Sequence, residues 1–436
     1  MIKVAVASLG CSKNLTDTEH MLGIIKSGGF KIENDESKAD VIIVNTCCFI
    51  NDAKQESIDT ILDLARLKEE GHCKRLIVTG CLAQRYRDEI IKEMPEVDSV
   101  VGLGHIEDIL SVIKNEGKAV MCDDGYRHPA SERIRITPPY TAYLKIADGC
   151  DNRCTYCVIP SVRGGFKSRP IEDLTDEAKR LAKSGVKELI IIAQDTTSYG
   201  IDLYGEARLV PLLKGLCEIP GIEWIRLHYC YPERITDELI DLISNEDKIC
   251  NYLDIPVQHC NGEILRRMGR RGDRNTLEAL ISKIRAKIPG ITIRTTLITG
   301  FPGETEEQSA EAEDFIRNMR FERLGVFAYS QEEGTPAAKM DGQISDEVKR
   351  KRLESLMLAQ AEVTEQLSAE KIGKTIKVLT EGYDPIIKKH YGRSEGDSAD
   401  IDGKVFFSAD TRIAEGEFVL VKIDDAMDYD LFGRVE

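Results

Sequence analysis

Three cysteines stand close together near the middle of the chain, at Cys150, Cys154 and Cys157, with the spacing C-x3-C-x2-C. A cube of four irons is normally held by four thiolates, so three clustered cysteines leave one iron open. An open metal position is typical of catalytic rather than structural metal sites. A structural zinc site, the alternative, would need a fourth Cys or His at a finger-like spacing. The segment therefore predicts a catalytic iron–sulfur cluster.

A second set of cysteines is spread over the N-terminal part of the chain. Cys11, Cys47 and Cys81 each follow a short apolar run that we predict to be a strand. The carboxyl ends of parallel strands share one edge of an open α/β sheet, so these thiols are expected to meet there. Cysteine is also a common core residue, and Cys48 is a second candidate beside Cys47. The pattern predicts a second three-cysteine cluster, again with an open iron.

The elements that must position the second set occupy residues 1–120. Strand-like and helix-like patterns alternate there, with strands predicted over 3–9, 41–46 and 75–79 and helices over 17–26, 53–69 and 84–93. This alternation predicts parallel strands in a doubly wound, flavodoxin-like α/β sheet.

The first set lies in a segment over 136–366 with six predicted strands. They cover 142–147, 188–193, 224–228, 252–257, 293–298 and 324–329, and helical patterns separate most of them. Six such units predict a partial TIM barrel, (β/α)6. Cys150 follows the first strand, at the face where barrel enzymes carry their chemistry. A polar helix over 346–372 closes the segment, with Gly373 as its stop.

The last segment, 369–436, has short predicted strands over 375–380, 405–408, 417–423 and 430–435. Turn residues separate them, which predicts a small all-β barrel. From Glu370 onward there are 10 Lys and Arg against 15 Asp and Glu, so this domain is acidic.

The composition argues against several classes of protein. A chain of 436 residues is expected to form two to three domains. Thirteen cysteines without an export signal point to metal or redox chemistry in a reducing cytoplasm rather than to disulfides. No apolar stretch is long enough to span a bilayer. The net charge of −16 argues against broad nucleic-acid binding. We therefore expect a cytoplasmic protein with no membrane partner.

With both cysteine sets placed, the chain resembles the methylthiotransferase family of radical S-adenosylmethionine (SAM) enzymes over nearly its whole length. The resemblance also rests on Ser8-Leu-Gly-Cys-Ser-Lys-Asn14, Asn45-Thr-Cys-Cys-Phe-Ile50, Ile159-Pro-Ser-Val-Arg-Gly164, Ala193-Gln-Asp-Thr-Thr-Ser-Tyr-Gly200 and Gly392-Arg-Ser-Glu-Gly-Asp-Ser-Ala-Asp-Ile-Asp-Gly403. The last segment is particular to the branch that modifies an aspartate of the twelfth small-subunit ribosomal protein.

The resemblance implies a radical SAM core at 136–366, between a cluster domain at 1–120 and a TRAM domain at 369–436. It also implies two 4Fe–4S clusters, with SAM bound at the Cys150, Cys154 and Cys157 cluster and split into a deoxyadenosyl radical. The radical takes a hydrogen from the aspartate β-carbon, and the other cluster delivers a sulfur that a separate SAM has methylated. The clusters and SAM carry the chemistry, an electron donor such as flavodoxin supplies electrons, and no side chain reacts itself. This requires the sheet edge of the first domain to face the barrel mouth.

Contacts to SAM are expected near the ends of the barrel strands and beside the cluster. The candidates are Tyr156, Gln194, Gln258, Thr299 and Gly300. For the last two, the alternative is a plain strand-to-helix turn with Glu304 as a helix-start carboxylate. Arg163 and Arg169 are candidates for binding SAM or a substrate carboxylate, and ordinary ion pairs are the alternative.

Two rival functions remain open at this point. One is a sister methylthiotransferase that acts on isopentenyl-adenosine in tRNA, and the other is a non-catalytic iron–sulfur electron carrier or RNA-binding module. A tRNA enzyme is expected to have a basic terminal barrel, whereas this one has a net charge of −5. A carrier is expected to ligate its clusters fully. The protein substrate, either free or on the ribosome, is therefore preferred, without a direct tRNA substrate.

Overall fold

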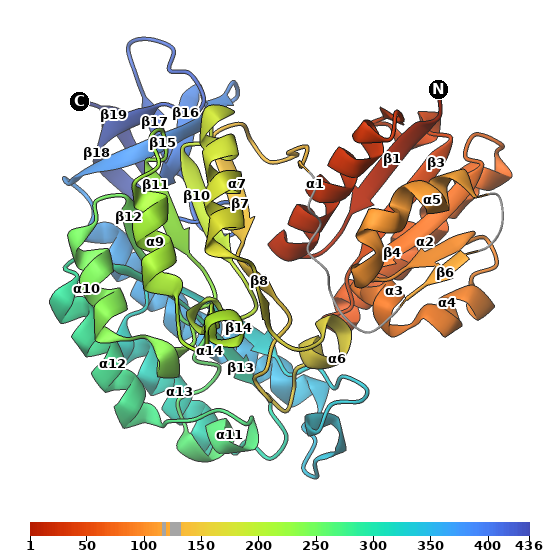
Figure 1. The fold of residues 1–436 in the computed structure, drawn as a ribbon. Coiled ribbons are helices and arrows are strands. Elements are labelled where there is room, and N and C mark those ends of the chain that lie inside the picture. The colour runs from red at the N-terminus through yellow and green to blue at the C-terminus, as the bar shows by residue number, and fades with distance from the viewer. Residues whose placement is uncertain (116–118, 123–131) are drawn as a thin grey trace.

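Three large sheets, each with its own core, follow one another along the described part of the chain, and β8 and β9 form a small two-stranded sheet besides them (Figure 1). The computed structural model describes residues 1–115, 119–122 and 132–436. Within these residues, no helix is long and apolar enough to cross a membrane.

The first sheet is parallel, with the strand order β2-β1-β3-β4-β5-β6. Its strands are β1 (Lys3–Ser8), β2 (Lys31–Ile32), β3 (Val41–Thr46), β4 (Arg75–Gly80), β5 (Ser99–Val101) and β6 (Ala119–Met121). The first five strands have the flavodoxin-like order, so the predicted doubly wound sheet is confirmed. The strands β2, β5 and β6 were missed because two or three residues show no measurable alternation.

The helices of this domain are α1 (Ser12–Ser27), α2 (Asn51–Glu69), α3 (Cys81–Arg85), α4 (Arg87–Glu93) and α5 (Ile109–Lys114). Figure 1 shows α1 between the first sheet and the barrel. Eleven of its 16 residues are buried. The predicted start at residue 17 was five residues too late, because the first turn is polar and yet buried between two domains.

The second sheet is an open parallel barrel with the strand order β14-β13-β12-β11-β10-β7. Its strands are β7 (Thr141–Lys145), β10 (Glu188–Ile192), β11 (Trp224–Leu227), β12 (Ile249–Asp254), β13 (Thr292–Thr299) and β14 (Arg323–Ala328). The main helices are α7 (Ile171–Lys183), α9 (Leu209–Cys217), α10 (Asp237–Asn245), α12 (Arg274–Lys287), α13 (Glu306–Met319) and α14 (Asp346–Ala369). The predicted partial TIM barrel of six units is confirmed.

Shorter helices and strands lie around the mouth of this barrel. They are β8 (Ala147–Asp148), α6 (Ile159–Arg163), β9 (Lys167–Ser168), α8 (Ile201–Tyr204) and α11 (Gly262–Arg267). One predicted strand, 252–257, was placed three residues too far along the chain, since β12 ends at Asp254. Pro256 follows closely and has no N–H to donate to a neighbouring strand.

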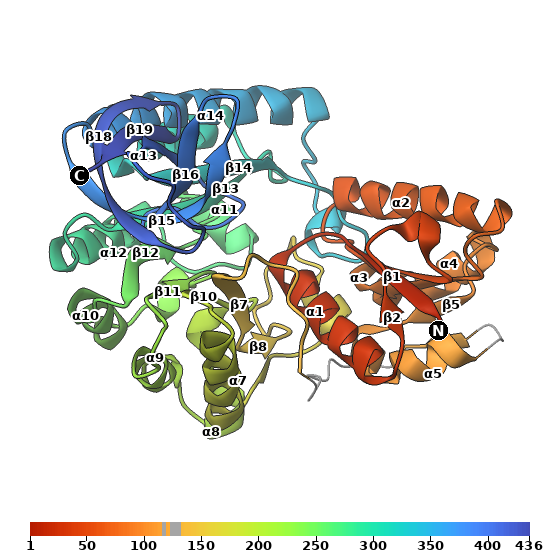
Figure 2. The same cartoon turned by 90° about the horizontal axis from the view of Figure 1, so that it is seen from above.

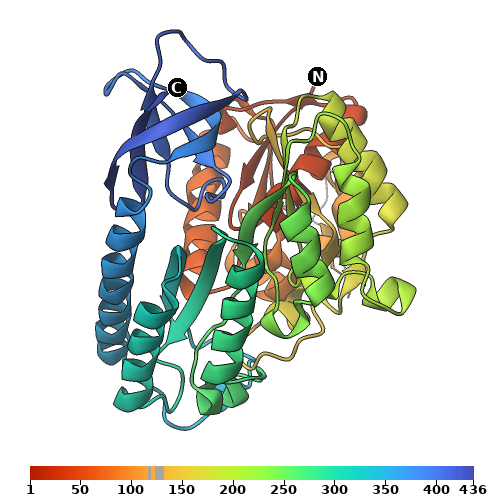
Figure 3. The same ribbon diagram turned by 90° about the vertical axis from the view of Figure 1, so that its left-hand side faces the viewer.

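The third sheet is a closed barrel of β15 (Thr375–Asp384), β16 (Lys389–Ser394), β17 (Val405–Ser408), β18 (Phe418–Met427) and β19 (Asp430–Val435). Figure 3 shows α14 leading up to it. The predicted small barrel is confirmed, but β16 was missed because its sequence is polar and contains Gly392. A Cβ on Gly392 would lie 2.1 Å from the Leu379 carbonyl oxygen, so the close approach of β15 requires glycine there.

The loop between β16 and β17, residues 395–404, closes the amino-terminal end of the (β/α)6 barrel, and we call it the plug loop. Its Ala399 packs against Tyr143, Ile190 and Ile192 inside the barrel. Seen from above, β15–β19 lie over the barrel strands (Figure 2). The amino-terminal end of a TIM-type barrel contributes stability and the carboxyl-terminal end carries the chemistry. The plug loop therefore leaves the functional end free.

Candidate active site at the barrel mouth

The three N-terminal cysteines lie at one edge of the first sheet. Cys11 caps the start of α1, Cys47 directly follows β3, and Cys81 begins α3 after β4. Because β1, β3 and β4 are parallel neighbours, the three reach the same edge. The structure thus brings these thiols together, and their binding of a cluster stays a prediction.

Cys47 faces the loop that carries Cys11. A Cβ on Gly10 would lie 2.6 Å from the Cys47 Cβ, so these two segments touch. The Cys47 backbone N–H also donates to Ser57 Oγ at 3.0 Å, which holds the start of the loop. This placement favours Cys47 over its neighbour Cys48 as the ligand.

The surroundings of Cys47 and Cys81 disfavour their thiolate forms. Burial raises the pKa of Cys81 well above its usual range, and although Arg163 opposes the shift, the nearby Cys48, Cys11 and Cys47 add to it. Burial also raises the pKa of Cys47. Since a cysteine must lose its proton to bind metal, ligation here requires a compensating positive charge such as a metal centre.

The Asn14 side chain contacts the chain at the carboxyl ends of β1, β3 and β4. Its Nδ2 donates to the carbonyl oxygens of Thr46 at 2.8 Å and Leu9 at 3.1 Å. Its Oδ1 lies 3.7 Å from Cys81 Sγ. One side chain therefore links the loops that carry all three cysteines.

The second cysteine set lies in the loop after β8. The backbone N–H of Cys157 donates to the Cys154 carbonyl oxygen at 3.1 Å, and the N–H of Cys150 donates to the Gly164 carbonyl oxygen at 3.1 Å. The Tyr231 hydroxyl lies 2.7 Å from Cys154 Sγ. The loop is thus held by its own backbone and by the turn after β11.

Burial and the neighbouring thiols disfavour charge on Cys150 and Cys157 as well. Burial raises the pKa of Cys150 to about 11, and Asp195 and Cys154 add to the shift. Burial raises the pKa of Cys157 to about 12, with contributions from Cys154 and Cys150. The three thiols are therefore close enough to influence one another's charge.

The arrangement of the two sets differs from that of a mononuclear metal site. In the described ranges of the chain, no three His, Cys, Asp or Glu side chains are arranged to hold a single metal ion. A zinc ion draws its thiolates to about 2.3 Å from one point. Thiolates on an iron–sulfur cube bind separate irons and do not converge in this way. Two sets of three free thiols match the donor chemistry of a cube with an open iron.

A buried group of four charges joins the first domain to the barrel mouth. Lys145 at the end of β7 donates to Asp17 of α1, and to Asp148 at 2.9 Å. Arg163 at the end of α6 donates to Asp148 at 2.6 Å and to Asp17 at 3.3 Å. We call these four residues the mouth ion pairs. Two positive and two negative charges balance, as buried charges require.

Arg163 also completes a path between the two cysteine sets. Its Nη2 donates to Asn14 Oδ1 at 2.6 Å, and that oxygen lies beside Cys81. Arg163 also contacts Asp148, which accepts a hydrogen bond from the Gly149 N–H at 2.8 Å. Gly149 directly precedes Cys150. The predicted facing of sheet edge and barrel mouth is therefore confirmed.

The predicted SAM contacts lie around the same mouth. The Gln194 amide donates to Asp148 Oδ1 at 3.0 Å, while its own Oε1 is buried and accepts no hydrogen bond within the described residues. Gln258 adopts a φ of 69° and is 8% exposed. Tyr156 packs beside Met268 and Phe301. Gln194 thus keeps an acceptor available, whereas Tyr156 contributes mainly to packing.

Thr299 and Gly300 are occupied by a carboxylate of the chain itself. The Thr299 hydroxyl donates to Glu304 at 3.4 Å, and the Gly300 N–H donates to it as well. Arg352 pairs with the same carboxylate at 2.9 Å and His259 lies 3.2 Å from it. These contacts favour the alternative of a structural strand-to-helix turn, and SAM contacts at Thr299 and Gly300 remain a prediction.

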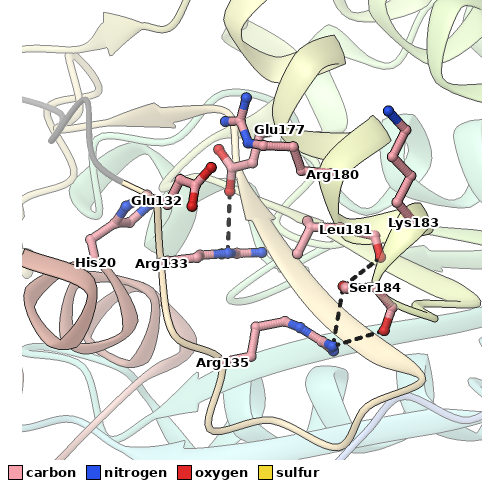
Figure 4. Close-up of a pocket in the computed structure, with 9 residues that line it drawn as sticks. All are labelled: His20, Glu132, Arg133, Arg135, Glu177, Arg180, Leu181, Lys183 and Ser184. Carbon is pink, nitrogen blue, oxygen red and sulfur yellow. Dashed lines mark hydrogen bonds and ion pairs between the residues drawn. The ribbon is translucent and has the colours of Figure 1, made fainter. Parts of the chain in front are cut away.

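The two candidate arginines are both engaged in internal ion pairs. Arg163 belongs to the mouth ion pairs, and Arg169 donates to Glu177 at 2.6 Å. Beside Glu177, a hollow of about 410 Å³ lies between α1, residues 132–135 and α7 (Figure 4). There Arg133 Nε lies 3.3 Å from Glu177 Oε1. This hollow contains none of the predicted site residues.

Sequence reasoning missed the polar side chains of α1 that reach the mouth. Lys13, Asn14 and Asp17 look like an ordinary solvated helix start, but all three are buried. Lys13 and Asn14 stand in the motif Ser8-Leu-Gly-Cys-Ser-Lys-Asn14, which served only as evidence for the family resemblance. A polar residue within two or three positions of an expected ligand is therefore a candidate in its own right.

Three family models match successive parts of the chain. The model described as "Uncharacterized protein family UPF0004" matches residues 3–102, the radical SAM superfamily matches 144–316, and the TRAM domain matches 372–435. Among solved structures, the radical SAM methyltransferase TsrM from Kitasatospora setae has a TM-score of 0.56 at 15% identity, covering 77% of this chain and 76% of its own. The cobalamin-dependent SAM radical enzyme OxsB has a TM-score of 0.51 at 14% identity, covering 82% and 56%. These likenesses show a shared fold.

Curated relatives match from end to end. A protein of Pelotomaculum thermopropionicum described as ribosomal protein uS12 methylthiotransferase RimO is 53% identical, covering 99% of each chain. Proteins of the same description from Lachnoclostridium phytofermentans and Clostridioides difficile are 51% and 49% identical, covering 100% of this chain and 100% and 99% of their own. The chain therefore belongs to the RimO family of ribosomal protein uS12 methylthiotransferases, with a radical SAM core.

Proposed function

We propose that the chain is a radical SAM methylthiotransferase that adds a methylthio group to the β-carbon of an aspartyl residue of ribosomal protein uS12. The observation that carries this proposal is the identity of about half of all residues, over the full length, to relatives described as uS12 methylthiotransferases. The path from Cys81 through Asn14 and Arg163 to the loop of Cys150 supports it.

Two cofactor sites follow from the two cysteine sets. Cys150, Cys154 and Cys157 would hold the cluster that binds SAM, and the N-terminal set would hold a second 4Fe–4S cluster. When bound, SAM and the clusters supply the radical and sulfur chemistry that side chains lack. Gln194, with its open buried acceptor, is the strongest of the predicted SAM contacts.

The protein itself positions the reacting groups and excludes water. The mouth ion pairs fix α1 against β7 and α6, so that the cysteine loops keep a constant relative position. The plug loop seals the opposite end of the barrel. Holding reactants in a fixed geometry contributes a large part of the rate of any two-centre reaction.

A protein substrate fits the charge of the terminal barrel better than tRNA does. From Glu370 onward the chain has 10 Lys and Arg against 15 Asp and Glu. Phosphate contacts depend on an excess of basic residues, whereas uS12 requires no such patch. A ribosomal substrate, free or assembled into the subunit, would place the enzyme in the cytoplasm.

An electron donor has a matching surface beside the second cysteine set. A hollow of about 380 Å³ adjoins the loop of Cys154. Its charged lining residues are Asp151, Arg153, Glu233, Arg234, Arg270 and Arg271. The excess of basic residues suits an acidic carrier such as flavodoxin, because opposite charges steer electron-transfer partners together.

The test is a direct comparison of substrates. The anaerobically reconstituted enzyme is incubated with SAM and a reductant, together with uS12 in one reaction and tRNA in another. We expect a mass increase of one methylthio group on uS12 only, and no increase on uS12 with the target Asp replaced by Asn. Modification of tRNA alone would overturn the proposed substrate. Reduced enzyme that never cleaves SAM would favour an electron carrier.

A further inference from the structure

Lys13 is a buried cation with an unusual partner. It is the second residue of α1, two positions after Cys11, and only 6% of it is exposed. Its Nζ lies 3.0 Å from the centre of the Tyr229 ring. Among the residues that the structure describes, its ammonium group has neither a hydrogen-bond acceptor nor a carboxylate partner. An aromatic face offsets only part of the cost of burying a charge.

Other buried cations around the barrel lumen are paired. Lys145 and Arg163 share Asp17 and Asp148 in the mouth ion pairs. At the plug end, Arg226, Arg393 and Arg323 contact carboxylates at hydrogen-bond distance. The ammonium group of Lys13 therefore differs from these paired cations. This difference indicates that its partner is a group from outside the chain.

The carboxylate that contacts the backbone of Tyr229 already has a partner. The Tyr229 N–H donates to Asp254 Oδ2 at 3.1 Å, and its carbonyl oxygen accepts from the Thr196 N–H at 3.0 Å. Asp254 is in turn paired with Arg294 at 3.1 Å. Its carboxylate is thus already committed, and the Tyr229 ring is held in place under the ammonium group.

Lys13 lies at the place that the substrate must reach. Its neighbour Leu15 packs with Tyr229 and Tyr143, which line the barrel lumen. Its helix starts at the cysteine edge of the first sheet, and the same helix contacts Arg163 of α6, which follows the loop of the second cysteine set. A group bound at Lys13 therefore lies between the first domain and the barrel.

From these observations we infer that the Lys13 ammonium binds the side-chain carboxylate of the substrate aspartyl residue. This inference rests on the proposed function and names the recognition group for that substrate. The aspartyl β-carbon is bonded directly to the carboxyl carbon, so a group that holds the carboxylate also positions the β-hydrogens. A charged hydrogen bond to the ammonium would complete the pairing that the folded chain lacks. Lys13 is thus a specificity-determining and positioning residue.

The experiment measures the preference for aspartate over asparagine. Fluorescein-labelled uS12 peptides that carry either Asp or Asn at the target position are titrated against the reconstituted holoenzyme, and the dissociation constants are read from fluorescence anisotropy. Lys13→Met removes the charge at similar length, Lys13→Arg keeps it, and Lys26→Met removes an exposed lysine near the other end of the same helix. Iron content is determined for each protein.

We expect wild type, Lys26→Met and Lys13→Arg to prefer the Asp peptide. Lys13→Met should bind it about 10- to 100-fold more weakly, with little change for the Asn peptide, as for a lost hydrogen bond between charged groups. The ratio of the two constants does not depend on the fraction of folded protein. A Lys13→Met protein that keeps the wild-type preference overturns the inference, whatever its iron content. Wild type that modifies no uS12 overturns the proposed function instead.

Discussion

The two ends of the (β/α)6 barrel use the same kind of interaction for different purposes. At the amino-terminal end, Glu188 is fully buried and pairs with Arg226 at 2.8 Å and with Arg393 of the terminal barrel at 2.6 Å. At the mouth, the mouth ion pairs hold the first domain in place, but Lys13 stays unpaired among the described residues. Both ends thus use buried charges to dock a neighbouring domain. The mouth keeps the Lys13 ammonium and the Gln194 acceptor available for a ligand.

This difference indicates where stability and function are located. Burial alone would raise the pKa of Glu188, but Arg393 and Arg226 lower it to about 2, so the pairing outweighs the desolvation. The plug loop adds Asp397, which pairs with Arg323, and Ser398, whose Oγ lies 2.8 Å from His228 Nε2. The amino-terminal end is therefore expected to respond to mutation with a loss of stability, and the mouth with a loss of activity.

The largest expected effect is at the mouth, on Cys81. Cys81→Ser should abolish methylthiolation and lower the iron content from about eight to about four per chain, since each cube holds four irons. Iron analysis and the uS12 mass assay measure both. Cys73→Ser is the matched control at the other end of β4. Cys73 Sγ donates to the Arg75 carbonyl oxygen at 3.1 Å, a bond that serine can keep. Full iron content in Cys81→Ser would contradict the cluster assignment.

The next effect is on stability at the plug end. Glu188→Ala leaves two buried arginines without a shared partner and should lower the free energy of unfolding by about 3–5 kcal/mol. The only tryptophan, Trp224, is 2% exposed and lies 4.8 Å from the Phe418 ring across this interface. Its fluorescence during urea unfolding reports the loss directly.

Two further variants give reference values for the loss of stability expected in Glu188→Ala. Asp17→Ala at the mouth should cost less, about 1–3 kcal/mol, because Asp148 still pairs with Lys145 and Arg163. Glu223→Ala removes an exposed contact to Lys377 at 3.9 Å and should change the stability by at most about 1 kcal/mol. A loss for Asp17→Ala that exceeds the loss for Glu188→Ala would reverse the comparison of the two ends.

A smaller effect is expected on acidification. Burial lowers the pKa of His20 from 6.5 to about 3, although Glu177 opposes the shift. Between these values the unfolded chain binds the proton and the folded chain does not, so protons favour unfolding. Lowering the pH from 6.5 to 5 should therefore cost about 2 kcal/mol. Urea midpoints at pH 7 and pH 5 measure this cost.

His20→Gln should weaken this dependence on pH and leave the part that His228 contributes. At the plug end, burial also lowers the pKa of His228, with Arg226 and Arg294 adding to the shift, so His228 contributes with the same sign. Glu188, whose pKa is lowered to about 2 from 4.5, loses its contribution only below this window. A wild-type midpoint that is independent of pH between 7 and 5 would contradict the prediction.

The smallest effect is at Ser398. Ser398→Ala removes the hydrogen bond to His228 and should lower the free energy of unfolding by about 1 kcal/mol. The Trp224 fluorescence midpoint measures it, and the uS12 mass assay is run beside it because His228 directly precedes Tyr229. A strong loss of activity with normal stability would show that the plug loop takes part in catalysis.

Much of the architecture was predictable from local patterns. The strands with strong apolar runs, such as β3 and β10, were placed within one residue, because burial on both faces leaves a clear signature. The polar strand β16 was missed, and β12 was displaced by a turn-like Cys250-Asn251 pair. The six cysteines were singled out from their spacing and from the strand ends, and the structure brings each set of three together. Lys13, Asn14 and Asp17 were not found, since their burial comes from a domain more than 100 residues away.

The amino-acid sequence by itself determined the chemistry available to this protein. A loop of eight residues from Cys150 to Cys157 contains the three thiols that we propose as cluster ligands, and local spacing is enough to single them out. Only the tertiary structure decided which polar residues surround that chemistry. Arg163 reaches Asn14, and Lys13 reaches Tyr229, through the docking of α1 onto the barrel. Such contacts depend on the packing of separate domains, for which no local sequence pattern exists.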